Sequence, residues 1–221
     1  MNIKINIQKI SQNLPPGCEL VAVTKTKGVA LIQEAYDAGH RDFGENKVQE
    51  LVPKYEALPK DIRWHMIGHL QSNKVKYIVP FVHLIHSIDS ERLLAEVDKQ
   101  AAKVNRTVSC LLQVHIASED TKFGFSADEV KSFLRSAKMA TYRNVRIVGL
   151  MGMATLTENE SQVSSEFNTL YKVFEGLRGE SLSGNTVMEI LSMGMSGDYS
   201  LAVAAGSTMI RVGSAIFGDR S

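Results

Sequence analysis

The chain has 221 residues, of which 44% are hydrophobic and 22% charged, and its formal net charge is +1. This length and composition are typical of one globular domain, and so small a net charge gives no sign of a nucleic-acid or anionic-membrane partner. No apolar stretch reaches the ~20 residues that span a bilayer. The amino terminus also lacks the continuous apolar segment of a signal peptide, so we expect a cytoplasmic protein.

Short runs rich in β-branched and apolar residues alternate with stretches of helical periodicity along the whole chain. In chain order, the predicted strands are 20–23, 41–43, 62–67, 82–88, 108–116, 145–150, 187–191 and 208–212. The predicted helices between them are 30–39, 46–58, 71–79, 91–104, 126–136, 161–177 and 198–206. Ser90 is a predicted helix cap, and Ser126 with Glu129 has the spacing of a capping box.

Eight strands that alternate with helices predict parallel pairing through helical crossovers, and eight is the number that closes a barrel. We therefore predict the α/β class and a single-domain (β/α)8 TIM barrel over residues 1–221, with an open doubly wound sheet as the alternative. The chain ends soon after the eighth predicted strand. We expect the stretch 5–14, before the first strand, to form a helix that takes the vacant place in the outer ring.

The first candidate for chemistry is Lys25, which directly follows the apolar run LVAVT at the end of the first predicted strand. Active-site residues of parallel barrels lie at the carboxyl ends of the strands. We expect partial desolvation there to lower the pKa of the Lys25 amine and to prepare it for Schiff-base chemistry. The alternative is a solvated lysine at a strand end, which is the role we expect for Lys27.

Two loops rich in glycine and serine follow the seventh and eighth predicted strands, at 192–198 and 211–214. Small residues let backbone N–H groups approach an anion, and loops at these two positions are the recurrent phosphate site of such barrels. Either loop alone is explained as an ordinary glycine turn, but together they predict a phosphate-bearing ligand.

Arg211 stands in an otherwise apolar strand, where an unpaired arginine is costly to bury. Closure of the eighth strand onto the first predicts that Arg211 and Lys25 are neighbours across the mouth of the barrel. A structural ion pair is the alternative for Arg211.

Further polar residues follow the other predicted strands. Asn46 is placed either to cap the next helix or to contact a ligand, and Lys122 is placed to reach the same mouth from the fifth strand. For His65 and His69 we favour packing or a ligand contact over zinc, because no acidic or sulfur partner is nearby. His83 and His86 are three apart in or near a strand, which predicts opposite faces and structural roles.

Seven segments together resemble, in order, the signature blocks of the YggS/PROSC pyridoxal-phosphate homeostasis proteins. They are AVTKTK, FGENKVQE, WHMIGHLQSNK, TKFG, GLMGM, LSMGMSGD and STMIRVGSAIFG, from near residue 20 to residue 218. The resemblance implies a barrel like the amino-terminal domain of alanine racemase, with pyridoxal 5′-phosphate as its cofactor.

The resemblance also implies the roles of individual residues. Lys25 matches the lysine that forms the Schiff base, and Arg211 matches the arginine that faces the pyridine nitrogen. An arginine there, unlike an aspartate, does not keep that nitrogen protonated, so the ring is a weaker electron sink. The cofactor-binding residues implied in this way are Lys25, Asn46, Lys122, Ser192, Ser196, Arg211, Gly213 and Ser214.

Related racemases carry a second domain that supplies a tyrosine on the other face of the cofactor, whereas this chain ends at Ser221. Two-base racemisation needs proton-transfer groups on both faces, and the sequence nominates only Lys25. We therefore predict a non-catalytic protein that buffers or delivers pyridoxal phosphate, with an amino-acid racemase of low activity as the alternative and a sugar-phosphate isomerase as a third hypothesis. The expected partners are the cofactor and the apoenzymes that receive it, neither nucleic acid nor membrane, and the expected state is a monomer.

Overall fold

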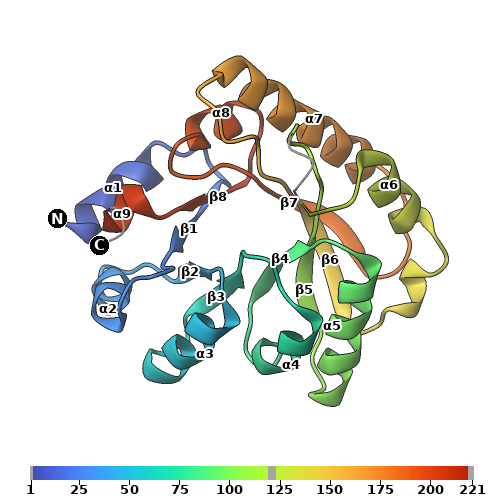
Figure 1. Cartoon of the computed structure of the whole chain (residues 1–221), viewed down its shortest axis with the longest axis horizontal. Helices are drawn as coiled ribbons and strands as arrows, with labels where there is room; N and C mark the ends of the chain where they lie inside the picture. The colour runs from blue at the N-terminus through green and yellow to red at the C-terminus, as the bar shows by residue number, and fades with distance from the viewer. Residues whose placement is uncertain (1, 119–122, 219–221) are drawn as a thin grey trace.

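The structure is a computed structural model and describes residues 2–118 and 123–218. In this part of the chain, eight strands pair in sequence order and close into a parallel barrel surrounded by helices (Figure 1). The strands are β1 (Glu19–Val23), β2 (Asp42–Glu45), β3 (Arg63–Met66), β4 (Leu84–Ile88), β5 (Val108–Gln113), β6 (Val145–Met151), β7 (Thr186–Ser192) and β8 (Met209–Val212). The predicted TIM barrel is confirmed, and the open sheet is wrong.

The helices form the outer ring seen in Figure 1. They are α1 (Ile3–Gln12), α2 (Val29–Asp37), α3 (Val48–Ala57), α4 (Val75–Ile78), α5 (Glu91–Lys103), α6 (Ala127–Arg135), α7 (Glu160–Arg178), α8 (Tyr199–Ala204) and α9 (Ser214–Phe217), with 3-10 turns at Ser72–Lys74 and Met139–Thr141. No helix of the described residues is both long and apolar enough to cross a membrane.

Alternation along the strands divides the buried side chains between two layers, because successive side chains of a strand point to opposite faces. The larger layer packs between the barrel and the helices and includes Phe43, Trp64 and Ile210. A smaller cluster fills part of the barrel interior; it consists of Val21, Leu84, Leu111, Val148, Met151 and Met209. The buried polar side chains of the described residues include Asp42, His65, His86, Ser192 and Arg211.

The helix before the first strand occupies the place that was predicted for it. α1 packs against β1, α2 and α9, and Figure 1 shows α1 and α9 side by side where the two ends of the chain meet. The Asn6 side-chain amide donates to the Ile216 carbonyl at 3.0 Å. α9 has only four residues, so α1 completes the outer ring between α9 and α2.

The predicted caps are confirmed, but several element lengths differ from the prediction, among them strands 62–67 and 82–88, which are Arg63–Met66 and Leu84–Ile88. Ser90 accepts from the N–H of Leu93, and Ser126 and Glu129 form a complete capping box. The predicted strand 108–116 stops at Gln113; Val114 still donates to Met151 of β6 at 2.8 Å and also forms an isolated bridge with Phe125. The predicted helix 71–79 is a 3-10 turn followed by the single turn of α4.

Gly149 lies where the pairing register of β6 shifts against both β5 and β7. A substitution there tests how tightly the barrel wall is packed. Its φ is +152°, and an added Cβ would lie 1.8 Å from the carbonyl oxygen of Ile190 in β7. We expect Gly149→Ala to lower the free energy of unfolding by about 3 kcal/mol or more, measured by urea denaturation. The control is Gly176→Ala in α7, where the added Cβ meets nothing within 4 Å; we expect a gain of about 0.5–1 kcal/mol. Equal effects of the two substitutions would contradict this account of the wall.

Candidate functional site

A cavity of about 730 Å³ opens at the carboxyl ends of the strands. Six of the predicted site residues line it: Lys25, Asn46, Ser196, Arg211, Gly213 and Ser214. Among the described lining residues, the charged side chains are Lys25, Lys27 and Arg211, and none is a carboxylate. This distribution favours an anionic ligand.

Two predicted site residues do not join this group. Ser192 is fully buried at the end of β7 and is not part of the cavity lining, because its hydroxyl is used inside the barrel by Arg211 and His86. Lys122 lies outside the described residues. Lys27 was predicted to be a solvated lysine, but it is half-buried and lines the cavity. Its amine donates to the carbonyl of Gly218 at 3.0 Å.

Lys25 sits in a tight turn that leaves β1. The N–H of Thr24 still pairs with the carbonyl of Gly44 in β2 at 2.9 Å, and the N–H of Lys27 closes the turn on the carbonyl of Thr24 at 2.9 Å. Thr26 adopts a φ of +65°, which is strained for a β-branched residue by about 1–3 kcal/mol. The surrounding structure therefore has to hold this turn in place.

A buried ion-pair network outside the barrel wall provides that support. Lys54 of α3 is 7% exposed, and its ammonium donates to Glu45 at 2.6 Å, to Glu50 at 3.2 Å and to the Thr24 carbonyl at 2.9 Å. Glu45 also accepts from the Thr24 hydroxyl at 2.6 Å, and Glu50 accepts from the N–H of Thr26 at 2.8 Å. The residues on both sides of Lys25 are thus tied to α3.

The carboxylates of this network differ in how burial affects them. Burial raises the pKa of Glu45 above its ordinary value, although Lys54 and Thr24 donate to it. Burial acts in the same direction on Glu50, but the Thr26 N–H and the Lys54 ammonium hold the pKa of Glu50 below its ordinary value. Lys54 is therefore the cation on which both carboxylates depend.

Asn46 contacts the cavity and does not cap a helix. The N-cap of α3 is Lys47, one residue later, and it makes no side-chain cap. The Oδ1 atom of Asn46 is buried without a hydrogen-bond partner in the structure. Because an unpaired buried polar atom costs about 1–3 kcal/mol, this amide is suited to a polar group of a ligand.

The two loops predicted to bind phosphate meet at one point. The N–H of Gly213 donates to the Ser196 hydroxyl at 3.1 Å. A Cβ on Gly213 would lie 3.1 Å from the carbonyl oxygen of Val23, so glycine lets the loop approach β1 closely. The helical hydrogen bonds of α9 begin with the N–H of Ile216, so the N–H groups of Ser214 and Ala215 are those that an anion can engage, while that of Gly213 is bonded to Ser196.

Arg211 reaches the same cavity from inside the barrel. It is 3% exposed, and its Nη1 donates to the Ser192 hydroxyl at 2.6 Å while its Nη2 donates to the Gly152 carbonyl at 3.1 Å. Burial lowers the pKa of Arg211 to about 10, against the opposing charge of Asp198. The side chain therefore keeps its charge at neutral pH, and its hydrogen-bond partners are neutral groups instead of the carboxylate of an ion pair.

The rings of His83 and His86 both lie near the ring of His65, so the predicted opposite faces of His83 and His86 are wrong. β4 begins at Leu84, and His83 therefore precedes the strand and escapes its alternation. The rings of His83 and His86 lie 5.4 Å and 5.2 Å from the ring of His65. Burial lowers the pKa of His83 to about 4 and holds that of His86 well below its ordinary value.

His69 lies at the rim of the cavity. Its Nδ1 is 3.1 Å from a carboxylate oxygen of Asp89, and its ring stacks on Phe123 with centroids 4.5 Å apart. Phe123 also lines the cavity. The stacking on Phe123 agrees with the predicted packing role of His69. The expectation that no acidic partner lies near these histidines is wrong, because His69 contacts Asp89 and His65 contacts Asp42.

The residues present suit pyridoxal 5′-phosphate, which needs an amine, donors for a phosphate and polar partners for a pyridine ring. Lys25 supplies the amine, and the joined loops at Ser196 and Gly213 supply donors. The unpaired Asn46 amide and the charged Arg211 supply polar partners.

Comparison with known proteins agrees with this architecture. Residues 1–221 match the family model described as alanine racemase, N-terminal domain. A pyridoxal phosphate homeostasis protein from Synechocystis is 41% identical over 214 residues, which covers 96% of each chain. The chain belongs to the pyridoxal phosphate homeostasis protein family.

Solved structures similar to this homeostasis-family chain share its whole barrel. PipY from Synechococcus elongatus without PLP gives a TM-score of 0.91 at 36% identity, over 98% of this chain and 100% of that one. PipY with PLP bound gives a TM-score of 0.86 at 35% identity over the same shares. The predicted family and the predicted barrel are both confirmed.

Lys54 provides a test of the network that supports the Lys25 turn. Lys54→Met leaves the buried Glu45 carboxylate without its cation, so we expect the free energy of unfolding to fall by about 3–5 kcal/mol in urea denaturation. Adding Glu45→Gln removes the orphaned charge and is expected to recover part of this loss. The control is Arg135→Met, which removes an ion pair with Glu180 whose side chains are 52% and 33% exposed; we expect a change under about 1 kcal/mol. A Lys54→Met variant as stable as the parent would overturn the argument.

Proposed function

We propose that this protein binds pyridoxal 5′-phosphate at the mouth of its barrel, through a Schiff base on Lys25, and buffers or delivers the cofactor without turning over a substrate. One observation carries the proposal: Lys25, Arg211 and the joined loops of Ser196 and Gly213 border a single cavity. Membership of the pyridoxal phosphate homeostasis family and the likeness to PipY with PLP bound support it.

The chemistry of each side chain assigns it a part in binding. Pyridoxal phosphate supplies an aldehyde that condenses with an amine, and a pyridine ring that withdraws electrons. Lys25 provides the amine, Ser196 and Ser214 provide donors for the phosphate, and Gly213 lets the loop approach β1 closely. Arg211 faces the ring nitrogen as a donor and keeps its own proton, so the ring is left a weaker electron sink than an acid would make it.

A carrier role is supported by what surrounds Lys25. Racemisation needs a second proton-transfer group on the opposite face of the substrate carbon. Besides Lys25, Lys27 and His69 are the described lining residues with an amine or imidazole that could transfer a proton. Both already have hydrogen-bond partners. Lys27 donates to the Gly218 carbonyl, and His69 is bonded to Asp89 and stacked on Phe123.

The wider setting belongs to the same proposal. We infer that the protein works as a cytoplasmic monomer and that its partners are pyridoxal phosphate and the apoenzymes that need it. The small net charge of +1 supports the expectation that neither nucleic acid nor an anionic membrane is a partner.

The covalent assignment is tested by mixing the purified protein with pyridoxal phosphate and recording the visible absorption spectrum. We expect a spectral shift that borohydride reduction and peptide mapping assign to Lys25. Lys25→Arg keeps the positive charge and should abolish the adduct, whereas Lys27→Arg is the matched control and should retain it. Label on Lys27 or Lys122, or failure to take up the cofactor, would refute the assignment.

The non-catalytic role is tested by a racemisation assay on a panel of amino acids with the cofactor-loaded protein. We expect no turnover above that of free pyridoxal phosphate, because the described residues that line the cavity offer no uncommitted second acid–base group. Robust racemisation that is lost in His69→Gln would favour the low-activity racemase instead and identify the second group.

A further inference from the structure

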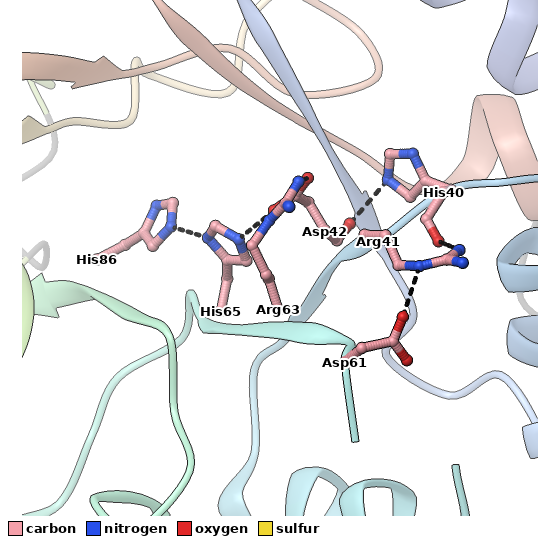
Figure 2. A network of polar contacts seen from close by, with 7 residues as sticks. All are labelled: His40, Arg41, Asp42, Asp61, Arg63, His65 and His86. Atoms are coloured by element: carbon pink, nitrogen blue, oxygen red, sulfur yellow. Dashed lines mark hydrogen bonds and ion pairs between the residues drawn. The ribbon is translucent and has the colours of Figure 1, made fainter. Parts of the chain in front are cut away.

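A chain of hydrogen bonds runs through the polar part of the barrel interior and ends at Arg211. His65 Nε2 lies 3.1 Å from Asp42 Oδ1, and His65 Nδ1 lies 2.9 Å from His86 Nε2 (Figure 2). His86 Nδ1 then lies 3.0 Å from the Ser192 hydroxyl, which accepts from Arg211 at 2.6 Å. All five residues are at most 8% exposed. This hydrogen-bond chain connects β2, β3, β4, β7 and β8.

The two ends of the hydrogen-bond chain fix the direction of the bond at each end, and neutral rings fix the bonds between them. Arg211 is only a donor, so Ser192 accepts from it. Asp42 is an acceptor: burial alone would raise its pKa, but the donors His65 and Arg63 hold that pKa well below its usual range. His65 therefore donates from Nε2, and as a neutral ring it accepts at Nδ1.

The middle of the chain follows from these ends, since a neutral imidazole has one N–H. His86 donates from Nε2 to His65 and accepts at Nδ1 from the Ser192 hydroxyl. Every imidazole nitrogen of His65 and His86 and the Ser192 hydroxyl then have a partner. A second proton on His65 would push the His86 proton to Nδ1, and the Ser192 hydroxyl would lose its acceptor within the described structure. Burial, the neighbouring His65 and the charge of Arg211 also keep the pKa of His86 well below its ordinary value.

The far end of the chain is anchored at the opposite end of the barrel. Arg63, whose side chain is 48% exposed, binds the Asp42 carboxylate through two nitrogens. His40 Nε2 lies 2.8 Å from the Asp42 carbonyl, as Figure 2 shows, and the ring of His83 lies 5.4 Å from that of His65. Asp42 thus has fixed partners on the side away from the chain.

We propose that Asp42, His65, His86 and Ser192 are positioning residues for Arg211, and that their one-directional chain holds the guanidinium against the cavity. Ser192 and the Gly152 carbonyl occupy two of its N–H donors, which leaves the others for a ligand acceptor. The hydrogen-bond chain follows from the distances alone, and only its effect on pyridoxal phosphate rests on the proposed function.

The chain itself is tested without any cofactor. Long-range proton–nitrogen correlation spectra of the full-length, nitrogen-15-labelled protein at neutral pH report the tautomer of each histidine. We expect His65 and His86 both as neutral rings protonated at Nε2. In Ser192→Ala, the Nδ1 resonance of His86 should move to that of a nitrogen without a donor. An imidazolium, or a proton on Nδ1 of either ring in the parent protein, would overturn the proposed chain.

The effect on the ligand is tested by comparing two buried serines. Ser192→Ala removes the hydroxyl that accepts from Arg211, and we expect the dissociation constant of pyridoxal phosphate to rise about tenfold or more. Ser207→Ala is the matched control, because Ser207 is 4% exposed and its hydroxyl contacts only backbone carbonyls, including those of Leu191 and Met193. We expect less than about a twofold change there.

The two possible failures are distinguishable. Equal affinities of Ser192→Ala and the parent protein would overturn the positioning role. A parent protein that does not bind pyridoxal phosphate would instead overturn the proposed function, and the spectra of the unliganded protein would still decide whether the chain exists.

Discussion

The closure of β8 onto β1 is the constraint on which the site depends. The parallel pairing places Val21 beside Arg211 and Ala22 beside Val212, so residues almost 190 positions apart in the sequence border one cavity. The loop after β8 then lies against Val23, and a glycine at 213 permits that approach. Without this pairing, Lys25 would be an ordinary lysine after an apolar run, and the two glycine-serine loops would have no amine near them.

Local patterns explain why much of this arrangement was predictable from the sequence. Most strands contain a short apolar run, and the rule for parallel barrels locates chemistry at the carboxyl ends, which is where Lys25, Ser196 and Gly213 lie. The misplacements come from contacts that a local pattern does not contain. Asn46 lines the cavity and does not cap α3, because α3 starts one residue later than the cap interpretation requires. Lys54 looks like any helical lysine, and its burial depends on how α3 packs against β2.

The strand β2 carries acidic groups on both of its faces, and each is neutralised by a different cation. Asp42 points into the barrel and is neutralised by Arg63 and bonded to His65. Glu45 points outward and is neutralised by Lys54. Removing one member of such a pair is costly, because the other charge stays buried. The same four-residue strand therefore connects to both sides of the site, to the Lys25 turn through Glu45 and to Arg211 through Asp42.

The contact between α1 and α9 has a consequence for how the barrel forms during synthesis. The Asn6 side chain bonds to the carbonyl of Ile216, and β1 pairs with β8. The first strand and the first helix therefore wait for the last part of the chain, for roughly 10 to 40 s at the usual pace of translation. During that interval one side of β1 presents unpaired backbone groups, which invite pairing with other chains. The nascent protein is thus most in need of protection from aggregation before its carboxyl-terminal segment emerges from the ribosome.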